Sequence, residues 1–152
     1  MVSVIIPVFN EEKSLSSLFQ SIYESLSEAK YDFEIIFVND GSTDASAAVL
    51  DELEKSNSDF VRVVHLLRNY GQTAALSAGI DHSRFEIIVP LDADLQNDPT
   101  DIPSLVSKLN EGYDVVSGWR KDRKDSALKR NFLSFVANFL IRKITKVKIH
   151  DL

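Results

Sequence analysis

The sequence contains no cysteine, and its three histidines, His65, His82 and His150, are far apart along the chain. The absence of cysteine excludes disulfide bonds, thiol catalysis and cysteine metal sites, and it fits a reducing compartment. The scattered histidines give no support to a histidine-based metal site or catalytic triad. No apolar run approaches the ~20 residues that a membrane-spanning helix needs. No basic segment precedes the first apolar run, as one would in a signal peptide.

Two nucleotide-binding signatures are also missing. Neither G-x-G-x-x-G nor G-x-x-x-x-G-K-[ST] occurs anywhere in the 152 residues, which argues against a dinucleotide-binding fold or a P-loop. The overall composition, 44% hydrophobic and 26% charged, is that of an ordinary soluble globular protein. At this length we expect one domain with a sizeable core.

Charge is divided unevenly along the chain. Residues 1–118 carry seven Lys and Arg against 20 Asp and Glu, a net charge of −13, whereas residues 119–152 carry ten against three, a net charge of +7. The basic part suggests an anionic partner near the C-terminal end, such as phosphate groups or a membrane surface. On charge alone, a solvated basic helix is the simpler explanation.

Apolar patterns predict alternating strands and helices. Continuous apolar runs predict strands at 2–8, 33–39, 61–67, 85–91 and 114–119, and helical spacing predicts helices at 12–29, 44–56, 73–81, 101–111 and 127–146. Apolar strands separated by helices indicate an α/β fold with a mostly parallel sheet and helices on both faces. Ligands of open α/β sheets bind at the carboxyl ends of the strands, and the polar motifs of this chain fall there.

The most informative motif is Asp92-Ala93-Asp94, which follows the apolar run 87–91. Two carboxylates one residue apart project to the same side at the end of an extended strand. Both could therefore reach one hard divalent cation, with Gln96 as a third oxygen donor, and Mg²⁺ or Mn²⁺ holding a diphosphate is the expected occupant. A phosphatase-type D-x-D nucleophile usually follows the first strand, whereas this motif follows the fourth.

Polar residues also follow the first strand, in the run P-V-F-N-E-E. Asn10 is expected to cap the next helix, with the two acids favourable in its first turn. Capping does not explain why Phe9 and Glu11 crowd the end of a strand, where a base or ribose could be held.

The second and third strands end in N-D-G-S-T-D and R-N-Y-G-Q-T. Asp40 could accept hydrogen bonds from a nucleobase edge, while residues 42–44 could cap the following helix. Gly71, just before a predicted helix, gives the third motif the outline of a phosphate cradle.

The C-terminal quarter contains further candidates. Arg120 and Arg130 could each neutralise a phosphate with paired hydrogen bonds, although each alone would be an ordinary surface charge. The helix expected at 127–146 has an apolar stripe flanked by Lys and Arg, as an interfacial helix on anionic lipid requires. A helix packed on its own domain explains that pattern equally well. Because the chain stops abruptly at Leu152, we expect it to be truncated at its C-terminus.

These motifs, in their order and placement, resemble those of the family 2 glycosyltransferases with the GT-A fold. The resemblance is carried by V-S-V-I-I-P-V-F-N-E-E, F-V-N-D-G-S-T-D, R-N-Y-G-Q-T-A-A-L-S-A-G-I and V-P-L-D-A-D-L-Q-N-D-P. The runs V-V-S-G-W-R-K-D-R and K-R-N-F-L-S-F-V-A-N-F-L-I-R-K, followed by H-D, resemble more closely the branch that charges polyprenyl phosphates, which includes dolichyl-phosphate mannose synthase.

The resemblance implies that residues 1–152 form a Rossmann-like nucleotide-diphospho-sugar transferase domain. It implies inverting transfer from a UDP-sugar, preferred over a GDP-sugar, to a polyprenyl phosphate at the cytosolic membrane face. The implied partners are the sugar donor, the polyprenyl phosphate and the membrane surface, without nucleic acid, and homo-oligomers are left open. We expect a longer, membrane-anchored protein of which this fragment is a soluble part.

The resemblance also implies roles for individual residues. Those matching the nucleotide site are Pro7, Phe9, Glu11, Asp40, Gln72 and Asp92. Those matching the metal site for Mg²⁺ or Mn²⁺ are Asp92, Asp94 and Gln96. Those matching the catalytic positions are Arg120 and Arg130, facing phosphates, and Asp151, close to the reacting centre.

Three alternatives remain open from sequence. A family 2 enzyme of cell-envelope polysaccharide synthesis would glycosylate a saccharide hydroxyl and would need a base, for which Asp151 is the candidate. A sugar-phosphate nucleotidyltransferase would need a basic, Gly-rich loop after the first strand, where this chain is acidic. A nucleotide-binding or membrane-docking module without turnover is the non-enzyme alternative.

Overall fold

The computed structural model describes residues 1–118, of which Met1–Val116 form one compact unit. Its elements are β1 (Val2–Val8), α1 (Leu15–Glu28), β2 (Phe33–Asn39), α2 (Ser46–Ser56), β3 (Val61–His65), α3 (Gln72–Asp81), β4 (Ile87–Pro90), the short 3₁₀ helix η1 (Pro99–Asp101) and α4 (Ile102–Leu109). The four strands form one parallel sheet in the order β3-β2-β1-β4. The sequence prediction of an α/β fold with a mostly parallel sheet is confirmed.

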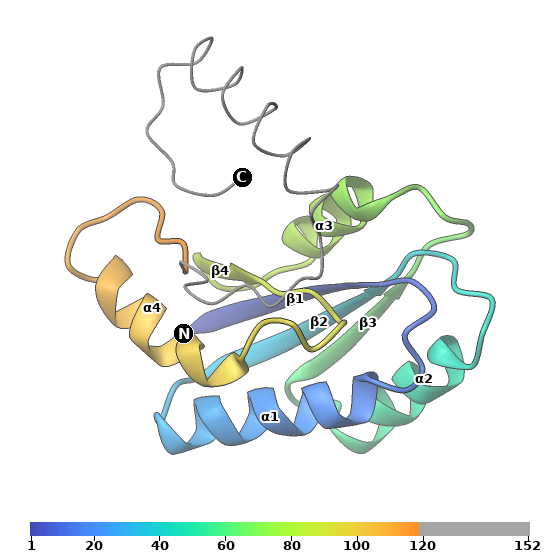
Figure 1. Ribbon diagram of the computed structural model, residues 1–152, viewed down its shortest axis with the longest axis horizontal. Coiled ribbons are helices and arrows are strands. Elements are labelled where there is room, and N and C mark those ends of the chain that lie inside the picture. Colours follow the sequence, from blue (N-terminus) through green and yellow to red (C-terminus); the bar gives the residue numbers. More distant parts are fainter. Residues whose placement is uncertain (119–152) are drawn as a thin grey trace, which may run out of the picture. The chain divides into compact units, whose positions relative to one another are not determined.

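Helices cover both faces of this sheet, with α3 on one side and α1, α2 and α4 on the other (Figure 1). Side chains alternate along β1 because successive residues of a strand point to opposite faces. Val4 and Ile6 therefore join the larger core with α1, α2 and α4, while Ile5 packs in the smaller core under α3. A Cβ on Gly79 would collide with the Ile5 side chain, so the glycine allows α3 to approach the sheet closely.

The predicted elements differ from the observed ones mainly at their ends. The bounds of β1 and β2 agree, whereas α1 and α2 begin three and two residues later than expected, and β3 and β4 are shorter. The strand expected at 114–119 is not formed by residues 114–118. The helix expected at 127–146 lies outside the described residues. Among the helices within 1–118, none has the length and apolarity to cross a membrane.

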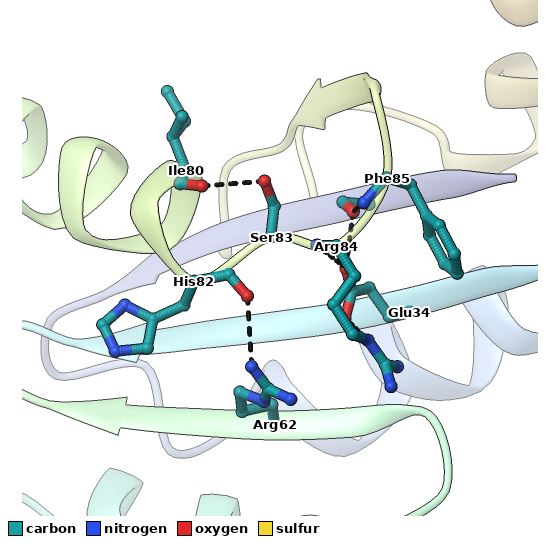
Figure 2. A network of polar contacts seen from close by, with 8 residues as sticks. Glu34, Arg62, Ile80, His82, Ser83, Arg84 and Phe85 are labelled. Atoms are coloured by element: carbon teal, nitrogen blue, oxygen red, sulfur yellow. Dashed lines mark hydrogen bonds and ion pairs between the residues drawn. The ribbon is translucent and has the colours of Figure 1, made fainter.

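A polar network lies at the amino end of the sheet, opposite the carboxyl ends of the strands (Figure 2). The buried Glu34 of β2, 1% exposed, accepts hydrogen bonds from the Ser3 hydroxyl and the Arg84 backbone N–H, both at 2.6 Å, and from Arg84 Nε at 2.8 Å. The Phe85 N–H donates to the Ser3 hydroxyl at 3.2 Å. This network fastens the start of β4 to the two central strands.

Candidate functional site

A cleft of about 400 Å³ opens at the carboxyl ends of the strands. In the sheet, β2 and β3 lie on one side of β1, and β4 pairs with β1 on its other side. Ligand sites of open α/β sheets lie where the strand order reverses in this way. The residues lining the cleft are Pro7, Val8, Phe9, Glu11, Asp40, Asn69, Gly71, Gln72, Asp92, Ala93 and Asp94.

The structure thus brings all six residues assigned to the nucleotide site, and both aspartates assigned to the metal, around one cleft. Gln96 is not among the lining residues. Sequence reasoning did not single out Asn69, although it falls in the R-N-Y-G-Q-T motif that signalled this loop. The predicted catalytic residues Arg120, Arg130 and Asp151 lie outside the described part of the chain.

Asp40 has two hydrogen-bond partners within the protein that the sequence did not predict. The residue is 3% exposed, and its two carboxylate oxygens accept hydrogen bonds from the backbone N–H groups of Tyr70 at 2.8 Å and Gly71 at 2.9 Å. The backbone at Gly41 lies very close to the β3–α3 loop: a Cβ on Gly41 would lie 2.6 Å from the backbone nitrogen of Asn69. Asp40 therefore ties the β3–α3 loop to the end of β2, a contact that spacing along the sequence could not reveal.

The loops after β1 and β2 are fastened to each other by side chains. The sequence predicted that Asn10 caps the next helix. This prediction is wrong, because α1 begins at Leu15 with Ser14 as its N-cap. Instead, Asn10 Oδ1 accepts hydrogen bonds from the backbone N–H groups of Thr43 at 2.7 Å and Asp44 at 3.3 Å. Asn10 has a φ of 58°, a left-handed conformation that asparagine tolerates better than most residues.

The same two loops exchange further hydrogen bonds around Glu11. The Glu11 N–H donates to Ser46 Oγ at 2.9 Å, and the Glu12 N–H donates to Asp44 Oδ2 at 3.2 Å. Partial burial raises the pKa of Asp44, but hydrogen bonds from Ser46 and from the Glu12 backbone outweigh it and hold that pKa below its ordinary value. Glu11 is consequently presented to the cleft by a loop that is fixed from two sides.

Asp92 lies two residues beyond the end of β4 at Pro90, and Asp94 lies in the turn that follows. The prediction that both aspartates follow the alternation of an extended strand is therefore wrong, although both residues line the cleft. Asp92 Oδ1 accepts a hydrogen bond from Gln72 Nε2 at 2.8 Å. Asp94 Oδ1 accepts from the Gln96 backbone N–H at 3.0 Å, and the intervening Leu95 has a φ of 60°.

The donor set suits a hard divalent cation in part. Within residues 1–118, no three His, Cys, Asp or Glu side chains converge as a complete metal cage. Asp92 and Asp94 nevertheless offer two exposed carboxylates on one cleft. Mg²⁺ is commonly held by one or two carboxylates, with phosphates and water supplying the other oxygens, so these two residues fit such an ion.

The cleft is strongly acidic. Its lining includes the four carboxylate residues Glu11, Asp40, Asp92 and Asp94, and no Lys, Arg or His is found among the lining residues of the described chain. A diphosphate placed here would be repelled unless a cation accompanied it. The charge of the cleft therefore favours a cation-bound diphosphate over a free one.

A family model described as glycosyl transferase family 2 matches residues 3–152, and the chain belongs to that family. Dodecaprenyl-phosphate galacturonate synthase of Rhizobium johnstonii is 45% identical over 150 residues, which are 98% of this chain and 44% of that protein. Undecaprenyl-phosphate 4-deoxy-4-formamido-L-arabinose transferase of Pseudomonas aeruginosa is 44% identical over 151 residues, 99% of this chain and 44% of that protein. The chain thus spans less than half the length of these relatives.

Solved structures share the fold. The mannosyltransferase PcManGT from Pyrobaculum calidifontis, in complex with GDP-Man and Mn²⁺, has a TM-score of 0.62 and 26% identity, covering 71% of this chain and 32% of that one. A mycobacterial protein has a TM-score of 0.61 and 29% identity, covering 92% of this chain and 48% of that one. The GT-A fold expected from the sequence is confirmed, as is the resemblance to enzymes named for polyprenyl phosphates.

Proposed function

We propose that this chain is the catalytic domain of a transferase that moves a sugar from a nucleotide-diphosphate sugar to a polyprenyl phosphate. The observation that carries the proposal is the similarity, over 98% and 99% of the chain, to two enzymes named for dodecaprenyl and undecaprenyl phosphate. A UDP-sugar is the proposed donor, and the cytosolic membrane face is the proposed place of reaction.

The cleft supports this proposal on the donor side. Phe9, 45% exposed, offers an aromatic surface for a base, and Glu11 offers a carboxylate for ribose hydroxyls, with Pro7 beside them. Asp40 lies deeper, and its remaining lone pairs are the acceptors proposed for the base. The nucleoside would occupy the side of the cleft formed by β1 and β2.

Asp92 and Asp94 would hold Mg²⁺ or Mn²⁺ on the diphosphate side, and Gln96 is a further proposed donor. When bound, such an ion neutralises charge that develops on the leaving diphosphate. The chain itself supplies the two carboxylates that hold the ion, in a cleft whose other charged residues are also acidic. The 26%-identical PcManGT complex with GDP-Man and Mn²⁺ supports a metal in this fold.

The proposed acceptor needs no strong general base. A phosphate monoester has a second pKa of about 6 and is already nucleophilic at neutral pH. Arg120 and Arg130 are proposed to face the phosphates, and Asp151 is proposed to lie near the reacting centre. A saccharide hydroxyl would need a base instead, and Asp151 would then be that base.

The test is a transfer assay with the longest naturally encoded form of this protein in membranes, supplied with UDP-sugars and either undecaprenyl phosphate or free saccharides. We expect labelled lipid product with Mn²⁺, and at least a hundredfold loss of rate in Asp94→Ala, because one metal carboxylate is gone. Asp59→Ala serves as control, since Asp59 is exposed in the loop before β3, away from the cleft.

Transfer to saccharides alone would replace the polyprenyl-phosphate proposal with the polysaccharide alternative. An unchanged rate in Asp94→Ala would remove the metal assignment. Nucleotide binding without transfer to either acceptor would favour a binding module without turnover.

A further inference from the structure

Gln72 links the start of α3 to the segment that follows β4. It is the first residue of α3, and its side-chain amide donates a hydrogen bond of 2.8 Å to Asp92 Oδ1, beyond the end of β4. The sequence assigned Gln72 to nucleotide binding. Within the protein, its side chain contacts Asp92, one of the two carboxylates suited to the metal.

The backbone of Gln72 is held from the opposite side of the cleft. Asp40 accepts the N–H groups of Tyr70 and Gly71, the two residues that precede it. On its other side, α3 is fixed by the buried Ala75 and by Gly79, whose missing Cβ lets the helix lie against Ile5. The amide of Gln72 therefore projects from a backbone that has contacts on both sides.

Asp92 lacks such support from its own segment. It is an exposed residue just beyond the end of β4, whereas Asp94 is held locally by the Gln96 N–H. Among the described residues, Gln72 is the one hydrogen-bond donor to the Asp92 carboxylate. A carboxylate that is fixed through one oxygen loses less rotational freedom when it binds a cation.

We infer that Gln72 is a positioning residue for the metal site: its amide fixes Asp92 Oδ1 and so sets the orientation in which Asp92 meets a divalent cation. Asp40 acts one step further back, by holding the loop from which Gln72 projects. The inference rests on the proposed function, because it assumes that Asp92 is a metal ligand.

The experiment uses Gln72→Met, which keeps an unbranched side chain of similar length and removes the amide. Gln72 is exposed, so the variant is expected to fold with an unchanged melting temperature. Gln20→Met is the matched control, because Gln20 Nε2 donates in the same way to Glu24 Oε1 at 2.7 Å on the outside of α1. Free Mn²⁺ is measured by electron paramagnetic resonance during titration with the metal alone.

We expect Gln72→Met to weaken Mn²⁺ binding about tenfold, as removal of a ligand's hydrogen-bond partner commonly does, and Gln20→Met to leave it unchanged. In an Asp92→Ala background, Gln72→Met should have no further effect, because its target is absent. Since no nucleotide is present, a direct contact between Gln72 and the nucleotide would not change these values.

Three results would overturn the inference, and they separate a failure of the positioning role from a failure of the metal site. If Asp92→Ala weakens Mn²⁺ binding and Gln72→Met does not, the metal site stands and the positioning role fails. The same holds if Gln72→Met weakens binding equally with and without Asp92. If Asp92→Ala leaves Mn²⁺ binding unchanged, the proposed metal site and the positioning role both fail.

Discussion

Glu34 is a charged side chain with almost no access to solvent, placed far from the cleft. Burial raises the pKa of its carboxyl, but hydrogen bonds from the Ser3 hydroxyl and from the backbone and side chain of Arg84 outweigh burial and hold that pKa below its usual range. The folded-state pKa is thus below that of the unfolded chain. The ionised carboxylate therefore stabilises the fold above about pH 4.3, and this stabilisation is lost as pH falls through the folded-state pKa.

We predict that Glu34→Gln lowers the free energy of unfolding by about 1–3 kcal/mol at pH 7, because a buried donor then loses its charged acceptor. The difference from wild type should shrink as pH falls below about 4.3, the ordinary pKa of a glutamate, and should vanish once the pH is below the lowered folded-state pKa of Glu34. Urea unfolding at a series of pH values measures it. Glu86→Gln, at an exposed acid in the loop before β4, should change stability by less than about 0.5 kcal/mol. Equal stabilities of Glu34→Gln and wild type at pH 7 would contradict the prediction.

At the scale of residues, the sequence could place the site but could not give every partner. Asp40 and Asp92 were predictable as cleft residues because each follows an apolar run, and the carboxyl ends of parallel strands meet at one edge. Their hydrogen bonds to Tyr70, Gly71 and Gln72 depend on where the β3–α3 loop crosses the sheet, which no local pattern records. The acidic character of the cleft was visible in the sequence, but the reason that Asn10 is an asparagine was not.

At the scale of elements, the C-terminal end of α1 has a lysine, Lys30, at a position where glycine is preferred. The Tyr31 N–H donates to the Leu26 carbonyl and the Lys30 N–H to the Ser27 carbonyl, both at 3.0 Å, which is the Schellman pattern of hydrogen bonds. Lys30 occupies the left-handed position with a φ of 57°. Glycine is preferred there, because a Cβ in this conformation crowds the neighbouring carbonyl oxygen.

We predict that Lys30→Gly raises the free energy of unfolding by about 0.5–1 kcal/mol, the relief of strain exceeding the extra entropy of glycine in the unfolded chain. Denaturant melts of the purified chain measure the change. Lys55→Gly, near the end of α2 but inside the helix, should instead cost about 1 kcal/mol. A loss of stability in Lys30→Gly would show that the lysine side chain contributes more than its backbone strain costs.

Element boundaries show where local patterns suffice and where they do not. β1 and β2 were predictable residue by residue because they are central strands with continuous apolar runs. α1 begins late because residues 10–12 are engaged with the loop before α2, which periodicity ignores. The apolar run after residue 113 suggested a fifth strand, yet Val115 is 82% exposed and no neighbouring strand pairs with it in residues 1–118.

The whole chain separates charge along its length, with −13 in residues 1–118 and +7 beyond them. Since the cleft lies in the acidic part, a nucleoside diphosphate approaches against an unfavourable potential. Long-range repulsion of this kind depends on ionic strength, because the screening length falls from about 30 Å at 0.01 M to about 8 Å at 0.15 M salt.

We predict that UDP raises the melting temperature more with Mn²⁺ than in EDTA, since a ligand of the native state stabilises it by mass action. In EDTA, the smaller effect of UDP should grow as NaCl rises from about 10 to 150 mM, because screening weakens repulsion. A thermal-shift panel with UDP, GDP, CDP and dTDP measures both effects. A larger shift with GDP would reverse the base preference, and equal shifts with Mn²⁺ and EDTA would contradict the need for a cation.

The contact between Asp40 and the β3–α3 loop has a consequence for anion binding. Backbone N–H groups ahead of a helix, together with the positive end of the helix dipole, commonly receive a phosphate. In this chain the N–H groups of Tyr70 and Gly71 already receive the carboxylate of Asp40. The backbone N–H groups that could bind a phosphate are thus occupied by the protein's own carboxylate. A phosphate placed at these N–H groups would be repelled by the buried negative charge of Asp40. A loop with the outline of a phosphate-binding loop thus serves here as an internal brace.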